Sequence, residues 1–481
     1  MSARPLATIP PSKIKLGLAT AAPPQTVSTF QALHFAFALV LPFVVSLPFK
    51  LVKEYVLARW WSPYVAIGRS PKAHAGALFS AHFFGRCSTS QSRLVFNHEA
   101  YAGIFSKTLS RLGLPSDWVQ HVDSKGTTGF WMAPPGTKRS EDDLVMLYIH
   151  GGGFTLDCGG GGLPFHLELA KKLNLDQGLQ YSVFHLDYQL APEFRYPSQL
   201  IETLAAYHYL VNTLGISEDR IVLAGDSAGG NLATAFLLHL ARPNPAIKVP
   251  AELGPTPRRP AAAILISPFN NLVSFTPSRS SNAAYDIIDD GSCFQAALKY
   301  VNAPVPASCR SAPSLNPFHL ARGFPNAPPP WDFPFITETR PFEAEEEGSG
   351  TKLMSSPYVN PSRCKDLEWW KSAMPGEGKT LVTWGGKEIF ADDDEEMFGV
   401  LEKAGVAPSK LYKDLGAHDW VIFDSSMPEM WKTASKGPDN YREYGVDSVA
   451  GFLFKHFGNS ASSVKRSGEG VIPESTVRRR A

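Results

Sequence analysis

The segment Gly-Asp-Ser-Ala-Gly at residues 225–229 restricts the fold of this chain more than any other part of the sequence. An apolar run at 221–224 precedes it, and a run with helical spacing at 231–241 follows it. Small residues are needed beside a serine at which a strand turns sharply into a helix, because strand and helix pass close to one another there. We therefore predict a strand, a strained turn at Ser227 and a helix whose N-terminal amides point toward the serine. Ser227 is the candidate nucleophile.

A run of glycines at residues 150–154, His-Gly-Gly-Gly-Phe, directly follows an apolar run at 144–149. Consecutive glycines let backbone N–H groups turn into a pocket, because no Cβ atoms stand in the way. We expect the amides of Gly152 and Gly153, together with that of Ala228, to form an oxyanion hole with three donors. The segment lacks the Gly-Lys-Ser/Thr ending of a phosphate-binding loop.

Apolar runs of strand length alternate with helical patterns from about residue 140 to residue 270. Strands that alternate with helices form parallel βαβ units, and near-continuous apolar character fits strands that are covered on both faces. We therefore predict an α/β fold with a mostly parallel, doubly wound sheet flanked by helices. The expected strands are 144–149, 181–186, 221–224 and 262–266, with helices between them at 163–173 and 198–214.

The alternation of strand and helix patterns ends after residue 270 and resumes near residue 376. The strands expected there are 379–384 and 409–413, followed by a closing helix at 446–457. The intervening segment contains a proline-rich run and an acidic run at 343–350, which we expect to be a solvated, disordered loop. The predicted division is an N-terminal segment at 1–60, a lead-in that contributes to a cap at 61–140, the two parts of the core at 141–270 and 376–458, a cap insertion at 271–375, and a disordered basic tail at 459–481.

An apolar stretch at residues 30–49 contains no Asp, Glu, Lys or Arg, and Lys50, Lys53 and Arg59 follow it. About twenty apolar residues suffice to cross a bilayer as a helix, so we predict a retained membrane anchor. The alternative is an amphipathic helix that lies on the membrane or covers the mouth of the site. Basic residues flank the stretch on both sides, so positive charge does not indicate its orientation.

Composition excludes several classes of protein. A net charge of +1, from 46 basic and 45 acidic residues, provides no general field that would attract nucleic acid. The five cysteines form no CxxC pair, which argues against a zinc site or a dense disulfide framework. No HExxH motif and no GxGxxG motif after a strand occurs, so we expect no metal and no organic cofactor.

Three motifs occur in order along the chain: HGGGF at 150–154, DYQLAPE at 187–193 and GDSAGGN at 225–231. Together they resemble the hormone-sensitive-lipase-like branch of the α/β-hydrolases (alpha/beta hydrolase fold-3), over about 140–270 and again over about 380–425. The resemblance implies an α/β-hydrolase fold with a cap from the N-terminal segment and the insertion. Those two parts look most like fungal membrane-associated steryl acetyl hydrolases. Structural roles around the site are expected for His150, Gly151, Asp187 and Glu193.

A nucleophilic serine of this kind needs an acid and a histidine later in the chain, in that order. Glu388 stands where members of the resembled family usually carry an aspartate, and Asp392 follows four positions later. Glutamate reaches one methylene further and can hold an imidazole in the same way, so Glu388 is the expected acid and Asp392 the alternative. His418, on a turn after the strand expected at 409–413, is the expected base. We expect the acidic residues 393–396 to form the solvated first turn of a helix.

The resemblance and the motifs together predict a serine-dependent carboxylic ester hydrolase that works through an acyl-enzyme. An anchored enzyme suggests a hydrophobic or lipid-like ester, and a membrane-associated location such as the endoplasmic reticulum. Two alternatives remain: an amide, formamide or peptide hydrolase with the same triad, and an inactive ligand-binding protein on the same fold. Receptors of the second kind typically lose the histidine, whereas Ser227 and His418 are both present here.

Overall fold

The computed structural model describes residues 11–22, 27–96, 100–136, 138–157, 159–303, 350–426 and 444–464. The predicted acidic loop lies outside these residues except for its last position, Gly350, and so does the predicted basic tail from residue 465 onward. The closing helix is longer than predicted: α18 (Gly445–Val464) extends into the segment that was expected to be tail.

Eight strands form one sheet in the order β1-β2-β4-β3-β5-β6-β7-β8. Neighbours from β4 to β8 run parallel, whereas β1 and β2 are antiparallel at one edge, so the predicted mostly parallel sheet is confirmed. The strands are β1 (Val119–Ser124), β2 (Thr127–Met132), β3 (Leu144–Ile149), β4 (Tyr181–Leu186), β5 (Ile221–Asp226), β6 (Ala262–Ile266), β7 (Thr380–Gly385) and β8 (Ser409–Lys413).

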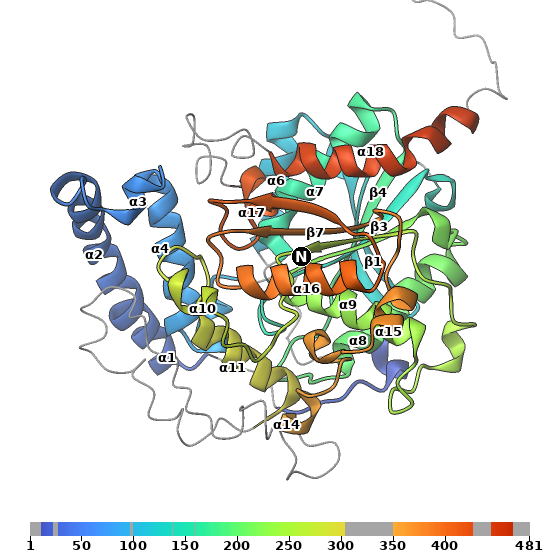
Figure 1. Ribbon diagram of the computed structural model, residues 1–481, viewed down its shortest axis with the longest axis horizontal. Helices are drawn as coiled ribbons and strands as arrows, with labels where there is room; N and C mark the ends of the chain where they lie inside the picture. Colours follow the sequence, from blue (N-terminus) through green and yellow to red (C-terminus); the bar gives the residue numbers. More distant parts are fainter. Residues whose placement is uncertain are drawn as a thin grey trace, which may run out of the picture.

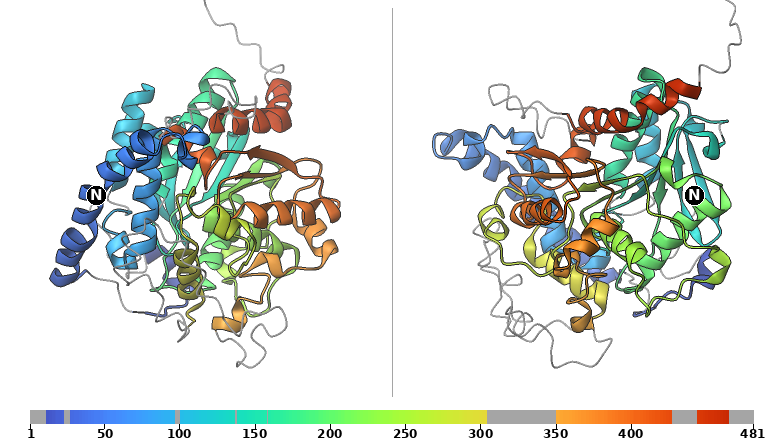
Figure 2. Two further views of the ribbon diagram at one scale, coloured as in Figure 1. Left: turned by 60° about the vertical axis from the view of Figure 1, so that its left-hand side comes forward. Right: turned by 45° about the vertical axis from the view of Figure 1, so that its right-hand side comes forward.

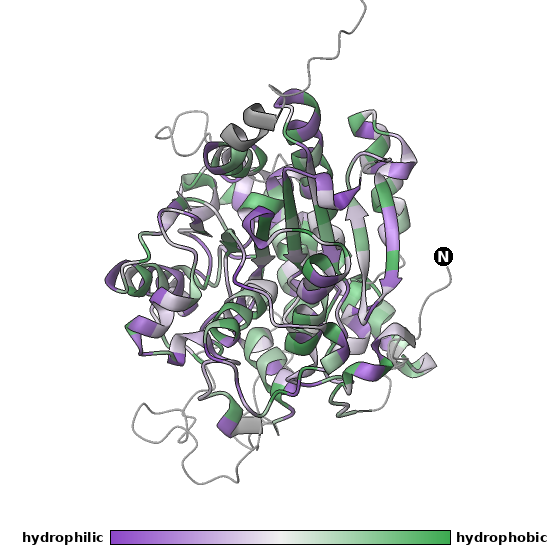
Figure 3. Cartoon of the chain, turned by 90° about the vertical axis from the view of Figure 1, so that its right-hand side faces the viewer, coloured by the Kyte–Doolittle hydropathy of each residue, from purple (hydrophilic) through white to green (hydrophobic). Residues whose placement is uncertain are grey.

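Successive side chains along each strand point to opposite faces of the sheet, and they form two hydrophobic cores, one on each face. Val145, Leu147 and Ile149 of β3 lie in one core, and Met146 and Tyr148 lie in the other. The central strands are hydrophobic along their length because both faces are covered (Figure 3). Helices on one face are α6 (Ala100–Leu112), α7 (Gly159–Lys171), α17 (Trp420–Ser426) and α18, and on the other α8 (Ser198–His208), α9 (Ser227–Ala241), α15 (Leu367–Ala373) and α16 (Ala391–Lys403) (Figure 1).

Residues 29–57 form a nearly continuous helix, here called the N-terminal rod, on one side of the molecule and outside α4 (Pro71–Arg86) (Figures 1 and 2). The rod comprises α1 (Thr29–His34), η2 (Phe35–Val40), α2 (Leu41–Val52) and η3 (Lys53–Leu57). Phe43 packs against Phe79 and Phe83 of α4, and His82 hydrogen-bonds the carbonyl of Leu39 at 3.1 Å. The stretch Ala32–Leu57 is long and apolar enough to cross a membrane, and only 11% of its apolar window is buried.

A buried ion pair ties the start of the described chain to the core. Lys13, in η1 (Pro11–Leu16), donates to the carboxylate of Glu202 on α8 and to the carbonyl of Asp187 at 2.6 Å. Both side chains are fully buried, and Glu202 also accepts from the amide of Gln189 at 2.9 Å. Burial raises the pKa of Glu202, and Lys13 opposes that rise by stabilising its charged form. Lys13 therefore holds the N-terminal segment against the DYQLAPE loop.

Removing the Lys13 ammonium is expected to destabilise the fold strongly. Lys13→Met leaves Glu202 buried without a counter-charge, which should lower the free energy of unfolding by about 3–5 kcal/mol. Urea denaturation measures this change, and Lys13→Met combined with Glu202→Gln should recover part of the loss. The control is Arg258→Met, which breaks the ion pairs of an exposed arginine with Glu218 and Asp219 and should leave stability close to wild type. Equal stability of the Lys13 and Arg258 variants would contradict the expectation.

Candidate active site

Ser227 is the first residue of α9 and follows β5 directly, as predicted. Its φ of +50° lies in the left-handed region, so the turn at the serine is strained. The flanking glycines are required by close packing. A Cβ on Gly225 would lie 2.4 Å from the carbonyl oxygen of Gly229, and a Cβ on Gly229 would lie 2.0 Å from that of Ile149. Larger residues at these positions would therefore displace the serine.

The glycine loop after β3 curls beside this turn. Gly152 and Gly153 have φ values of +112° and +59°, which residues with a side chain rarely adopt. The amide of Gly151 donates to Oδ1 of Asp226 at 2.9 Å, and the hydroxyl of Tyr148 donates to the same oxygen. Asp226 thus fixes the glycine loop to the serine turn. Ala228 is fully buried in the first turn of α9.

The four residues expected to be structural lie around this loop. The ring of His150 stacks on Tyr188, with centroids 4.2 Å apart. Glu193 pairs with Arg93 at 2.7 Å, and Arg93 also donates to the carbonyls of Thr155 and Ala191 at 2.8 and 2.6 Å. These contacts fix the chain just after the glycine loop. Asp187 takes part through its backbone carbonyl, which accepts from Lys13 and from Thr128.

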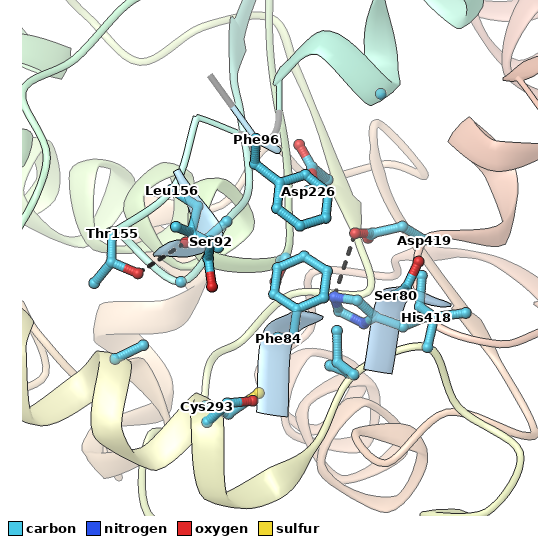
Figure 4. Close-up of a pocket in the computed structure, with 18 of the residues that line it drawn as sticks. Ser80, Phe84, Ser92, Phe96, Thr155, Leu156, Asp226, Cys293, His418 and Asp419 are labelled. Atoms are coloured by element: carbon cyan, nitrogen blue, oxygen red, sulfur yellow. Dashed lines mark hydrogen bonds and ion pairs between the residues drawn. The ribbon is translucent and has the colours of Figure 1, made fainter. Parts of the chain in front are cut away.

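His418 lies between β8 and α17 with its imidazole between two carboxylates. Nδ1 is 3.4 Å from Oε2 of Glu388, and Nε2 is 3.3 Å from Oδ2 of Asp419 (Figure 4). Glu388 follows β7 and is fully buried. Burial disfavours the imidazolium, but the carboxylates of Asp419, Glu388 and Asp286 outweigh that effect and raise the pKa of His418 to about 9.

Asp392, the alternative acid, lies elsewhere. Its carboxylate accepts from the amide of Ser278 at 2.7 Å, and its amide donates to the Ser278 hydroxyl at 3.1 Å. Asp392 is exposed and joins α16 to the short helix α10 (Ser278–Ser281) of the insertion. The structure therefore brings Glu388, and not Asp392, to the histidine.

The expectation that residues 393–396 are solvated is wrong for the first two. They do begin a helix, α16, but Asp393 is buried and pairs with Arg279 at 2.7 Å. Asp394 is fully buried, and burial raises its pKa well above the usual value, with the nearby Glu388 carboxylate adding to the rise. A run of acidic residues at a helix start does not reveal which of them turn inward, because that depends on the insertion packed beside it.

Sequence reasoning missed Asp286, which lies in the insertion. Its carboxylate accepts from the amide of His418 at 2.9 Å through Oδ1 and from the amide of Ile389 at 2.6 Å through Oδ2. Burial raises the pKa of Asp286 to about 6. One buried carboxylate therefore joins the loop that carries His418 to the loop that carries Glu388. Asp419 was also missed, although it adjoins His418 in sequence; its φ of +57° turns its carboxylate toward Nε2.

Ser227, His418 and the glycine loop open into one cavity of about 300 Å³. Its walls are largely apolar, with Phe84 of α4, Phe96 and Leu156 prominent (Figure 4). Residues of the lead-in helix α4 and of α11 (Asp290–Val301) in the insertion line the cavity. The lead-in and the insertion, which were expected to contribute to a cap, thus reach the site, whereas no described residue of the N-terminal segment at 1–60 lines the cavity. Within the described residues, no group of three His, Cys, Asp or Glu side chains could hold a metal ion.

Comparison with known proteins finds similarity to hydrolases over part of the chain. Residues 146–331 match the family described as alpha/beta hydrolase fold. Lipase 2 of Moraxella sp. (strain TA144) is 32% identical over 158 residues, 27% of this chain and 35% of the relative. An acetyl-hydrolase of Streptomyces hygroscopicus is 32% identical over 184 residues, 38% of this chain and 53% of the relative. Hormone-sensitive lipase of Mus musculus is 38% identical over 100 residues, 20% of this chain and 12% of the relative.

The chain thus spans about a third to a half of the length of the first two of these relatives. Among solved structures, a bacterial esterase of the hormone-sensitive lipase family aligns with a TM-score of 0.51 at 22% identity, over 81% of this chain and 99% of the other. A mutant of the esterase E40 aligns with a TM-score of 0.53, also at 22% identity, over 80% and 98%. At this identity the structural likeness shows the fold.

The carboxylates around His418 predict an alkaline pH profile for the reactivity of Ser227. A base must be deprotonated to accept a proton, so the rate of Ser227 labelling by a fluorophosphonate should rise with pH toward a midpoint near 9, the raised pKa of His418. Asp419→Asn removes the carboxylate at Nε2 and should move the midpoint down by about 1–3 pH units. Glu395→Gln, which affects an exposed pair with Lys410, is the control. A wild-type midpoint near 6.5, unchanged in Asp419→Asn, would refute this assignment.

Proposed function

We propose, on the premise that this chain carries an α/β-hydrolase domain related to hormone-sensitive lipase, that it is a serine-dependent carboxylic ester hydrolase. One observation carries the proposal. Ser227 sits at a strained strand-to-helix turn and shares a cavity with His418, whose Nδ1 lies 3.4 Å from the buried carboxylate of Glu388. That arrangement suits nucleophilic attack on a carbonyl carbon.

The proposed reaction has two acyl-transfer steps. His418 accepts the proton of Ser227 through Nε2 as the serine oxygen attacks the ester carbonyl, while Glu388 stabilises the imidazolium. The amides of Gly152, Gly153 and Ala228 hold the oxyanion. His418 then protonates the departing alcohol, and finally activates a water that hydrolyses the acyl-enzyme.

The cavity favours a substrate with a hydrophobic body. Phe84, Phe96 and Leu156 cover its wall, and relatives of the domain are named lipase, esterase and acetyl-hydrolase. The proposed substrate is a lipid-like ester, such as a sterol ester, because apolar walls favour an apolar substrate. Amide, formamide and peptide hydrolysis use the same triad chemistry, and an inactive ligand-binding protein could have the same fold.

Labelling and turnover together separate these functions. Wild-type protein should react with a fluorophosphonate and hydrolyse p-nitrophenyl esters far faster than the matching anilide. Ser227→Ala should lose labelling and at least about a thousandfold in kcat, because the nucleophile is removed. Ser280→Ala, at an exposed position on α10, is the matched control. Absence of labelling in a folded wild-type protein would favour the ligand-binding alternative, and an anilide preference would favour amide hydrolysis.

We further propose that the N-terminal rod associates with a lipid membrane. Its outer surface exposes large apolar side chains, including Phe37, Val44, Val45 and Phe49, which would be costly to leave in water. Trp60 and Trp61 are highly exposed just beyond its end, where aromatic residues favour the boundary between lipid and water. The inner face of the rod packs on α4, which forms a wall of the cavity. A membrane-bound rod would therefore place the cavity beside the lipid.

Cell fractionation tests this association. Wild-type protein should sediment with membranes and resist extraction by alkaline carbonate if the rod spans the bilayer; carbonate should release a rod that lies on the surface. A variant with Phe37, Val44, Val45 and Phe49 all changed to Ser should shift to the soluble fraction, because it loses apolar area that the lipid would cover. The control changes Leu175 and Phe275, two exposed apolar residues away from the rod, to Ser. Soluble wild-type protein would contradict membrane association.

A further inference from the structure

Helix α11 of the insertion presents one face to the catalytic cavity. Ser292, Ala296 and Lys299 have the spacing of a single helix face, and all three line the cavity. A Cβ added to Gly153 would lie 2.9 Å from Cβ of Ala296, so this face packs directly against the glycine loop. Lys299 lies about one turn further along the helix. A lysine thus faces a cavity whose walls are otherwise largely apolar.

Lys299 has a neutral partner. Its Nζ donates to the hydroxyl of Thr89 at 2.6 Å, and Thr89 is a buried residue of the short helix α5 (Thr89–Ser92) that also lines the cavity. The ion pairs of the described residues include no carboxylate within 4.0 Å of Lys299. Arg93, the neighbouring cation, is already paired with Glu193.

Four other enclosed cations of the described chain have a carboxylate partner: Lys13 with Glu202, Arg93 with Glu193, Arg279 with Asp393 and Lys413 with Asp424. Burial lowers the pKa of Lys299 to about 8, with the charge of Arg93 adding to the effect, so the side chain still carries its proton at neutral pH. An enclosed ammonium without a counter-charge is unfavourable unless something else supplies the negative charge.

We propose that Lys299 binds an anionic group of the substrate, remote from the ester that is cleaved. The substrate class would be an amphiphilic ester with an apolar body and a carboxylate, such as a half-ester of a dicarboxylic acid. The helix supports this orientation, because Ala296 packs on the glycine loop and Lys299 lies about one turn further along α11. The inference rests on the proposed ester hydrolase function.

A simpler role is that Lys299 only braces α11 against α5 through Thr89. Three variants separate the two roles. Lys299→Met removes the charge but keeps a long side chain, Lys299→Arg keeps the charge, and Thr89→Val removes the hydroxyl while leaving the ammonium in place. A bracing role requires the hydrogen bond to Thr89, whereas anion binding requires the charge.

The test compares kcat/KM for charged and uncharged esters in pairs. The carboxylate lies on the acyl side in the p-nitrophenyl half-esters of succinic, glutaric and adipic acid. Each half-ester is compared with the p-nitrophenyl ester of the unbranched fatty acid that has the same number of carbons. 4-Acetoxybenzoate against 4-methylphenyl acetate places it on the alcohol side. The readout is the ratio of charged to uncharged substrate within each protein, from which any loss of folded enzyme cancels.

In at least one pair, the wild-type ratio should exceed that of Lys299→Met by about tenfold or more, as expected for a charge-assisted contact. Lys299→Arg and Thr89→Val should keep most of the preference. Equal ratios in wild type and Lys299→Met for every pair would overturn the inference, as would loss of the preference in Thr89→Val but not in Lys299→Met. Failure of the proposed function looks different: no ester of either kind is hydrolysed and Ser227 is not labelled.

Discussion

The closeness of α9 to β3 determines the geometry on which the rest of the site depends. No side chain fits between Gly229 and the carbonyl of Ile149, so the first turn of the helix rests against the end of the strand. The glycine loop begins directly after that strand, and Asp226 hydrogen-bonds its first glycine, Gly151. The packing of α9 against β3 therefore fixes the position of Ser227 relative to the candidate oxyanion donors of the glycine loop.

The histidine and its acid are held by a different part of the chain. Asp286, from the insertion, accepts from the amides of His418 and Ile389, and Asn282 donates to the carbonyl of Glu388 at 2.9 Å. Arg69, in the lead-in, donates to the carbonyl of Tyr285, the residue before Asp286, at 2.5 Å. The cap thus does more than close the cavity. It holds the two loops that bring base and acid together, so a change in the cap would alter the position of His418 relative to Glu388.

The features that sequence predicted well are those set by local chemistry. The six strands expected in the core were found. Five of them are covered on both faces and are therefore nearly continuous apolar runs, whereas β8 lies at the sheet edge and is partly exposed. The edge strand β1 was missed because its residues are mostly polar and partly exposed. The resemblance to the family favoured Glu388 over Asp392, but sequence alone does not show which carboxylate turns inward. Sequence did not predict that Asp286 and Lys299 belong to the site. Both lie in an insertion without a recognisable motif, and they reach the site through contacts with distant segments.

Ionisable groups of both kinds, acidic and basic, line the cavity. Near Ser227, the Asp226 carboxylate is held by the hydroxyl of Tyr148 and the amide of Gly151, and Asp419 faces His418, so negative charge there is balanced by donors. At the α11 end, Lys299 contributes positive charge that only a hydroxyl contacts among the described residues. The proposed contact of Lys299 with an anionic group would orient a substrate by its charge as well as by its shape, because charges interact strongly where water is excluded.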